Sequence, residues 1–479
     1  MKKGTIVSVL FVLTALLFSA CGKSGNDKVT ENSPEVEYAY VPEYTQLGGG
    51  SLLYFSYIQF AGDSLFYKEI FFDPVNQQQE QILKQYSLTE NKIMREMDAN
   101  SQPEDGQRRH IGQYYALKDG RLYTTESVSS SASRREFVCA YDAEWNRIWE
   151  QDITDILNQI ERGSSADHIA VDSEGRICLA LSKALCLFDA EGMHLADVMM
   201  ENEFILGLSV DRDGGVYACY QKEYIDSGYC LAQVDFEKGT QGAIYQNFPD
   251  VRSNTITFSA GLESDFLTIG ADYLYGYDIA TQSAKELLSW AEYGMNGGGV
   301  KAVGIGENGE ILAFYSDTSE NFLVTMERVE AASLPKKTQI VIGCFGDGYQ
   351  QEAAAFNRQS DNCYVTVKNY AVAEDGTGKD VQDFVTELSM ALATGIDCPD
   401  ILVLGDMELY QMDIEAMAEN GAFADLEPFL EESASLKAED YLENALDCYR
   451  YAGALVGIPT SIDVETVVGK TSDVGEESG

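Results

Sequence analysis

The stretch VDSEGRI, residues 171–177, places an acidic residue and a glycine between two apolar positions. Variants recur as LKDGRLY at 117–123, VDRDGGVY at 210–217 and IGENGEIL at 305–312, with looser copies at 61–67 and 263–267. Asp-Gly or Asn-Gly between alternating apolar runs is the strongest short-range signal of a β-hairpin, and we expect both turn residues to adopt positive φ. The stretch therefore predicts a hairpin that repeats along the chain.

A second pattern follows several of these turns, in which an apolar or aromatic residue precedes an aspartate. We interpret it as the end of a third strand and the turn into a fourth; it occurs at 141–142, 188–189, 234–235 and 277–278. The turn glycines Gly120, Gly175 and Gly214 lie 55 and 39 residues apart. A period of this size with several strands in each unit is typical of a β-propeller. Six units fit residues 48–330, and two β-sandwiches are the competing architecture.

The repeated region shows no motif for catalysis. Asp211 and Asp213 suggest a calcium site, because calcium prefers carboxylate and carbonyl oxygens. The equivalent turns at 174–175 and 308–309 lack the full acidic set, so we favour a solvated hairpin turn. Paired carboxylates, a nucleophile motif and a glycine-rich phosphate loop are not evident in the sequence. We therefore predict no enzyme activity, no metal and no cofactor.

The first residues have the pattern of a targeting segment. Lys2 and Lys3 precede an uncharged run at 5–18, which has about the length of the apolar core of a signal peptide. The following LFSAC, residues 17–21, resembles the lipobox of bacterial lipoproteins. The resemblance implies that 1–20 are removed and that Cys21 carries the lipid. We expect 21–47 to be a flexible spacer, and the protein to be extracytoplasmic and anchored to the cell membrane.

The charge excludes one class of partner. The chain has 78 acidic and 33 basic residues, a net charge of −45, so the cationic surface that binds phosphates is missing and no nucleic acid is expected. Nine cysteines remain after Cys21, an odd number without a CxxC motif, which favours buried free thiols. Cys178 and Cys186 lie on what we predict to be neighbouring strands, so a cross-strand disulfide is the alternative.

The pattern changes class after a linker at 331–337. Strands are predicted at 339–344, 364–367 and 400–404, and helices at 349–359, 381–393 and 414–420, with Gly421 as the C-terminal cap. Alternating strands and helices of this length form right-handed crossovers on a parallel sheet. The whole chain is therefore predicted to be multidomain, with all-β propeller-like repeats followed by an α/β domain over 338–479.

Four ordered motifs in this domain resemble the family 1 extracellular solute-binding proteins, the substrate-capturing lipoproteins of ABC importers. They are AAAFNRQ with VTV at 353–367, LATG with PDI at 392–401, GAFADLEPF at 421–429 and GALVGIP at 453–459. The resemblance implies a periplasmic-binding-protein-like lobe, the start of a second lobe, and a cleft that closes on a small molecule, often a sugar. The matching part is shorter than members of that family, so we expect the domain to be C-terminally incomplete.

The resemblance also implies where the ligand binds. In this layout the ligand meets loops at the carboxyl ends of the strands, and the candidate residues are Asp347, Tyr349, Asp406, Tyr410, Thr460, Ser461 and Asp463. The implied partners are a small molecule, an ABC importer permease and the membrane. Two other hypotheses remain: a cell-surface adhesion or sensor protein whose propeller binds a polymer or a protein, and an enzyme that uses the propeller mouth.

Overall fold

A computed structural model describes residues 38–459, with internal gaps. The gaps are at 50–52, 76–77, 102–106, 131–132, 162, 201–202, 223–228, 250–257, 318–319, 347–348, 372–377, 379, 405–411, 434–435 and 452. By their internal contacts, residues 40–328 and 335–459 belong to one unit, whereas residues 38–39 and 329–334 group separately. None of the helices in the described part has the length and hydropathy of a membrane-spanning segment.

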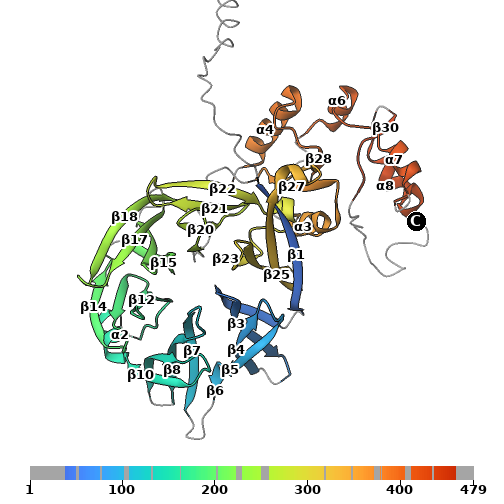
Figure 1. Ribbon diagram of the computed structural model, residues 1–479. Helices are drawn as coiled ribbons and strands as arrows, with labels where there is room; N and C mark the ends of the chain where they lie inside the picture. The colour runs from blue at the N-terminus through green and yellow to red at the C-terminus, as the bar shows by residue number, and fades with distance from the viewer. Residues whose placement is uncertain are drawn as a thin grey trace, which may run out of the picture. The chain divides into compact units, whose positions relative to one another are not determined.

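Residues 38–330 form a β-propeller of six blades, each an antiparallel sheet whose strands follow one another outward from the centre (Figure 1). Blade one is β2 (Leu53–Ala61), β3 (Ser64–Asp73), β4 (Gln78–Ser87) and β5 (Lys92–Asp98). Blade two is β7 (Arg108–Ala116), β8 (Leu122–Ser129), β9 (Arg134–Tyr141) and β10 (Arg147–Asp152), with the short β6 (Asn100–Ser101) beside β7.

The next three blades follow the same order. Blade three, after helix α2 (Thr154–Ile160), is β11 (His168–Val171), β12 (Ile177–Leu181), β13 (Ala184–Phe188) and β14 (His194–Met199). Blade four is β15 (Glu203–Val210), β16 (Val216–Lys222), β17 (Tyr229–Asp235) and β18 (Thr240–Phe248). Blade five is β19 (Phe258–Ala260), β20 (Phe266–Ile269), β21 (Tyr273–Asp278) and β22 (Ser283–Ser289), and the 3-10 helix η2 (Ala291–Tyr293) follows it.

Blade six is assembled from both ends of the propeller sequence. It contains β23 (Val300–Ile305), β24 (Ile311–Ser316) and β25 (Glu320–Glu330), and its outermost strand is β1 (Tyr38–Gly49). The expected flexible spacer at 21–47 is therefore wrong for residues 38–47, which pair in a sheet. The tyrosines at 38, 40 and 44 are the strand signal, because aromatic residues favour strands. The polar composition of 21–37 concealed this signal.

The hydrophobic core is divided among the blade interfaces. Among the described residues, one buried cluster lies between each pair of neighbouring blades. The cluster between blades six and one joins Leu65 and Tyr67 to Phe314 and Leu323. Every blade therefore buries both of its faces against neighbours, which excludes the competing arrangement of two β-sandwiches.

The hairpin prediction is confirmed in position but not in turn type. Gly120, Gly175, Gly214 and Gly309 all have φ between +85° and +89°, while none of the residues before them has positive φ. In blade two Gly120 N–H donates to Leu117 O and Leu117 N–H donates to Arg121 O. This is a three-residue turn that ends in a left-handed glycine, so only the glycine needs positive φ.

No disulfide joins the cysteines in the described part of the chain. Six of them are buried, as predicted: Cys139, Cys178, Cys186, Cys219, Cys230 and Cys344. The alternative of a disulfide between Cys178 and Cys186 is wrong, because the register of β12 and β13 pairs Cys178 with Leu187 and Leu179 with Cys186. The two thiols therefore point to opposite faces of the sheet.

The C-terminal part is a small α/β region, after the 3-10 helix η3 (Ala331–Ser333). Strands β26 (Thr338–Cys344), β27 (Cys363–Asn369) and β28 (Ile401–Val403) form a parallel sheet in the order β27-β26-β28. The helices are α3 (Gln350–Gln359), α4 (Val381–Thr394), α6 (Ile414–Glu419), α7 (Glu427–Glu432) and α8 (Glu443–Asp447), with the 3-10 helix η4 (Ala438–Asp440) and a short pair β29 (Arg450–Tyr451) and β30 (Ala454–Leu455). The predicted alternation of strands and helices is confirmed.

Helix α3 also contacts blade six within the same unit. The Arg358 guanidinium donates to Asp317 (2.7 Å) and to Gly294 O (3.0 Å). It lies within 6 Å of the ring centres of Tyr44, Tyr315 and Phe322. An arginine held by a carboxylate and by aromatic rings is a specific anchor, because its planar group can stack and donate at once.

The packing of neighbouring turns gives a stability prediction. A Cβ on Gly214 would lie 2.4 Å from Ser173 Cβ in the turn of blade three, and the backbone there has φ +89°. Gly214→Ala should lower the free energy of unfolding by about 2–4 kcal/mol, because backbone strain and a steric clash add. The control Gly163→Ala has the same backbone strain (φ +80°) but no atom within 4 Å, and it should cost about 1–2 kcal/mol. Urea unfolding of both variants measures the difference; equal losses would contradict the packing.

Candidate functional site

The inner strands of all six blades line a central channel with a volume of about 1770 Å³. All six inner strands begin at one mouth of the channel and end at the opposite mouth, where the hairpin turns lie. They are β2, β7, β11, β15, β19 and β23. Single small-molecule pockets are usually about 300–1,000 Å³. The channel is therefore large enough for an extended ligand.

At the mouth with the hairpin turns, the aspartates of two turns each accept hydrogen bonds from backbone N–H groups of the same turn. The Asp211 carboxylate accepts from the backbone N–H groups of Asp213 (2.9 Å) and Gly215 (2.7 Å). Asp172 makes the same pair of bonds to the N–H groups of Glu174 and Arg176. In the described part of the chain no group of acidic, histidine and cysteine side chains could hold a metal ion. The interpretation of these residues as a hairpin turn agrees with this geometry.

A different part of the channel wall contains a strained aromatic residue. Tyr57 on β2 has φ +51° and lies at a bulge, where the pairing with β3 shifts between Ser56 and Gln59. A bulky side chain in this conformation is an outlier that costs on the order of 1–3 kcal/mol. The Tyr114 hydroxyl on β7 donates to the Tyr57 carbonyl. Tyr57 lines the channel and is 46% exposed.

A buried lysine lies against this ring. Lys68 on β3 is fully buried, and its ammonium lies 4.2 Å from the centre of the Tyr57 ring. The Nζ donates to the carbonyl oxygens of Ile111 (2.5 Å) and Gly112 on β7. No ion pair joins Lys68 to a carboxylate among the described residues. Burial without a counter-charge lowers the pKa of Lys68 to about 7.

His168 contributes an uncharged polar group to the channel. It begins β11, and burial lowers its pKa to about 4, so the imidazole is neutral at physiological pH. Two hydroxyls of the lining, Ser56 Oγ and Ser259 Oγ, are buried atoms without a hydrogen-bond partner in the described chain. These groups can both donate and accept hydrogen bonds.

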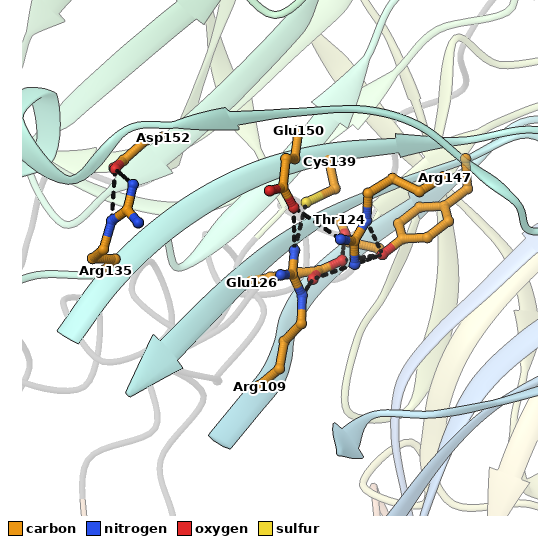
Figure 2. A network of polar contacts seen from close by, with 9 residues as sticks. Arg109, Thr124, Glu126, Arg135, Cys139, Arg147, Glu150 and Asp152 are labelled. Atoms are coloured by element: carbon orange, nitrogen blue, oxygen red, sulfur yellow. Dashed lines mark hydrogen bonds and ion pairs between the residues drawn. The ribbon is translucent and has the colours of Figure 1, made fainter. Parts of the chain in front are cut away.

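An extensive polar network lies within blade two (Figure 2). The Glu126 carboxylate, 1% exposed, accepts from Arg109, from Tyr141 and from Thr124 Oγ1 (2.8 Å). Glu150 pairs with Arg109 at 2.8 Å and with Arg147 at 2.8 Å. Burial favours the neutral acid, but the bonds from Tyr141 and Arg109 outweigh it and hold the pKa of Glu126 below its ordinary value.

This network ties together all four long strands of blade two. Arg109 comes from β7, Glu126 from β8, Tyr141 from β9 and Arg147 from β10. A second pair, Arg135 with Asp152, links β9 to β10 nearer the outer edge. Two arginines meet two glutamates, and each of these charged groups has a partner of opposite charge. Removing one member of such a buried set typically costs about 3–5 kcal/mol.

The residues predicted to bind a ligand in the α/β region are only partly covered by the structure. Tyr349 is half-buried and is the N-cap residue of α3. Asp347, Asp406, Tyr410, Thr460, Ser461 and Asp463 lie outside the described residues, and so do residues 1–20 and Cys21. The structure therefore does not test whether these side chains come together, and their roles stay predictions.

Sequence reasoning missed Tyr57, Lys68 and His168. A signal for Lys68 existed, because SLFYKEIFF at 64–72 is a largely apolar run. The two-residue period of a strand puts Lys68 on the same face as the apolar Phe66 and Ile70. A lone lysine on an inward face is unusual. The strain at Tyr57 had no local signal, since it depends on bulges in two strands that are distant in sequence.

Comparison with known proteins finds likenesses among solved structures alone. No protein-family model matches the chain, and no curated protein matches it. Among solved structures, the acylaminoacyl peptidase of Pyrococcus horikoshii is 12% identical, covers 82% of each chain and has a TM-score of 0.36. A glucose dehydrogenase is 11% identical over 59% of this chain and 98% of its own, with a TM-score of 0.34.

A third likeness is the Pan2 WD40 domain of Neurospora crassa, 10% identical over 59% of this chain and 95% of its own, with a TM-score of 0.34. At these identities and scores no argument about ligand or activity rests on the comparisons. The class that the fold defines is a six-bladed β-propeller with a small C-terminal α/β region.

The uncompensated Lys68 predicts a pH dependence of stability. Between pH 7 and about 10.5 the lysine is protonated in the unfolded chain but neutral in the folded chain. The unfolded chain therefore binds more protons, and the contribution of Lys68 to the free energy of unfolding rises with pH. The free energy of unfolding of the wild type, minus that of Lys68→Met, should be constant below pH 7. It should then increase by about 1.4 kcal/mol per pH unit. Urea unfolding from pH 5.5 to 10 measures it, and a constant difference over the whole range would refute it.

Proposed function

We propose that this protein is a lipid-anchored, extracytoplasmic solute-binding protein. It captures a small molecule, a carbohydrate, and delivers it to an ABC importer permease without changing it chemically. The signal-like residues 1–20, the lipobox-like segment at Cys21 and the four family-like motifs at 353–459 support this proposal.

The single observation that carries the proposal is the strand order of the α/β region. Strand β26 is central, the chain passes from it through α3 to β27 on one side, and then crosses through α4 to β28 on the other side. Ligands of open α/β sheets bind outside the carboxyl ends of the strands at such a reversal. Cys344 at the end of β26 pairs with Val403 at the end of β28.

This pairing bears directly on the candidate residues. The segment 345–349 follows β26 and contains Asp347 and Tyr349, and the segment 404–410 follows β28 and contains Asp406 and Tyr410. Both segments therefore start from adjacent strand ends at the reversal point. Carboxylates accept hydrogen bonds from sugar hydroxyls, and tyrosine rings stack on the apolar faces of sugars.

A second candidate function is binding of a polymer or a protein by the propeller, as in a cell-surface adhesion or sensor protein. The observation that favours it is the channel of about 1770 Å³, which is lined by all six blades. The two functions use different parts of the chain and can coexist.

Ligand binding in the α/β region can be tested with the full chain and a panel of mono- and disaccharides. The best binder in a thermal-shift screen is taken to calorimetry, where Asp406→Ala should weaken its binding at least about tenfold. Asp361→Ala is the matched control, since Asp361 is exposed and precedes β27 at the amino ends of the strands. Equal affinities of the two variants, or a panel without any binder, would reject the proposal.

Anchoring gives a separate prediction. Cys21→Ser should abolish incorporation of labelled palmitate and release the protein from the membrane fraction of the expressing bacterium, because the lipid is the proposed attachment. Cys448→Ser, which alters an exposed cysteine of the α/β region, should leave labelling and fractionation unchanged. Palmitate incorporation that persists in Cys21→Ser would disprove lipidation at this residue.

A further inference from the structure

The strained Tyr57 is held in place from two sides. The Tyr114 hydroxyl binds its carbonyl oxygen, and the ammonium of Lys68 lies beneath its ring. Lys68 is itself fixed by the two carbonyl oxygens of the β7 segment, where the pairing with β8 also shifts between Ile111 and Tyr114. Bulges in β2 and β7 thus meet around one buried lysine, and together they fix a half-exposed ring at the channel wall. Strain that the surroundings maintain in this way is a mark of functional sites.

The charges of the channel lining nearly balance. The lining contains six acidic and four basic residues, although the whole chain has a net charge of −45. Several of these charges are already engaged: Asp119 with Arg121, Asp172 with Arg176 and Asp211 with its own turn. A strongly charged polymer would find little complementary charge, whereas a neutral polar one would meet no electrostatic barrier.

Unused hydrogen-bonding groups of the lining are neutral. Ser56 Oγ and Ser259 Oγ have no partner in the described chain, although both atoms are buried. The imidazole of His168 is neutral and lies in the same lining. A buried polar atom without a partner costs free energy. A rotation of each serine side chain about χ1 would turn its hydroxyl into the channel, where a ligand with donor and acceptor groups would recover this cost.

We propose that the propeller channel binds a neutral oligosaccharide, which stacks on the Tyr57 ring and makes hydrogen bonds with Ser56, Ser259 and His168. A sugar chain presents both apolar faces and hydroxyl groups, and it has the length that a channel of about 1770 Å³ accommodates. The inference rests on the second candidate function and names its ligand class. It does not depend on ligand binding by the α/β region.

Calorimetry with the full chain and maltoheptaose, xylohexaose, cellohexaose and mannohexaose tests the inference. At least one of them should bind, and Tyr57→Ala should weaken that binding at least about tenfold, because an aromatic stack is lost. Tyr54→Ala is the matched control: it removes a tyrosine three positions away on the same strand that is 58% exposed and does not line the channel. Its affinity should stay within twofold of the wild type.

Ser259→Ala provides a second variant, should the loss of Tyr57 disturb folding. It removes a hydroxyl without a protein partner on a different blade. It should weaken binding about three- to tenfold, while the thermal midpoint of the free protein should not fall. If none of the four oligosaccharides binds, the inference is overturned. Equal effects of Tyr57→Ala and Tyr54→Ala, or tighter binding of a charged hexagalacturonate, would do so as well.

The same experiment separates this site from the α/β region. Tyr349→Ala should leave oligosaccharide binding to the channel unchanged. If Tyr349→Ala weakens binding and Tyr57→Ala does not, the sugar binds in the α/β region; that result would support solute binding there and overturn the channel site.

Discussion

The pairing of β1 with β25 is the constraint on which the rest of the propeller depends. Asn321 Nδ2 donates to Gly48 O across a separation of 273 residues. Each blade is apolar on both faces, so it is stable only between two neighbours. Without β1, blade six keeps three strands and exposes the edge of β25. The cluster that joins Leu65 of blade one to Phe314 of blade six then depends on an incomplete sheet, and open edges of this kind promote aggregation.

Two buried charges within the propeller are treated in opposite ways. Glu126 is compensated by two arginines and by two hydroxyls, so it fastens blade two internally. Lys68 has only carbonyl oxygens and an aromatic ring. Carbonyl dipoles solvate an ammonium less well than a carboxylate does. The protein therefore retains a buried ammonium without a carboxylate directly beside the strained backbone of Tyr57. Packing alone does not require two unfavourable features at one place in the channel wall.

Local sequence signals predicted the elements whose geometry is decided locally. The turns at Gly120, Gly175, Gly214 and Gly309 could be predicted because only glycine accepts their backbone conformation at low cost. The strands and helices of the α/β region followed from their periodicity. Burial of most thiols followed from apolar neighbours in the sequence.

Features that depend on distant segments could not be predicted. The strand β1 follows a polar segment and finds its partner only at the far end of the propeller. The positions of Cys178 and Cys186 on neighbouring strands were correct, but a shift of one residue in register decides whether two thiols meet. The environment of Lys68 arises from β7, 43 residues along the chain.

The burial of the thiols has a consequence for chemical durability. Burial raises the pKa of Cys139 to about 12 and also raises the pKa values of Cys178, Cys186 and Cys219. Because the thiolate is the form that reacts, these sulfurs are inert toward oxidants and toward disulfide exchange. The propeller thus needs no disulfide to persist in an oxidising environment. Among the cysteines of the described chain, oxidation would begin at the exposed Cys448, outside the propeller.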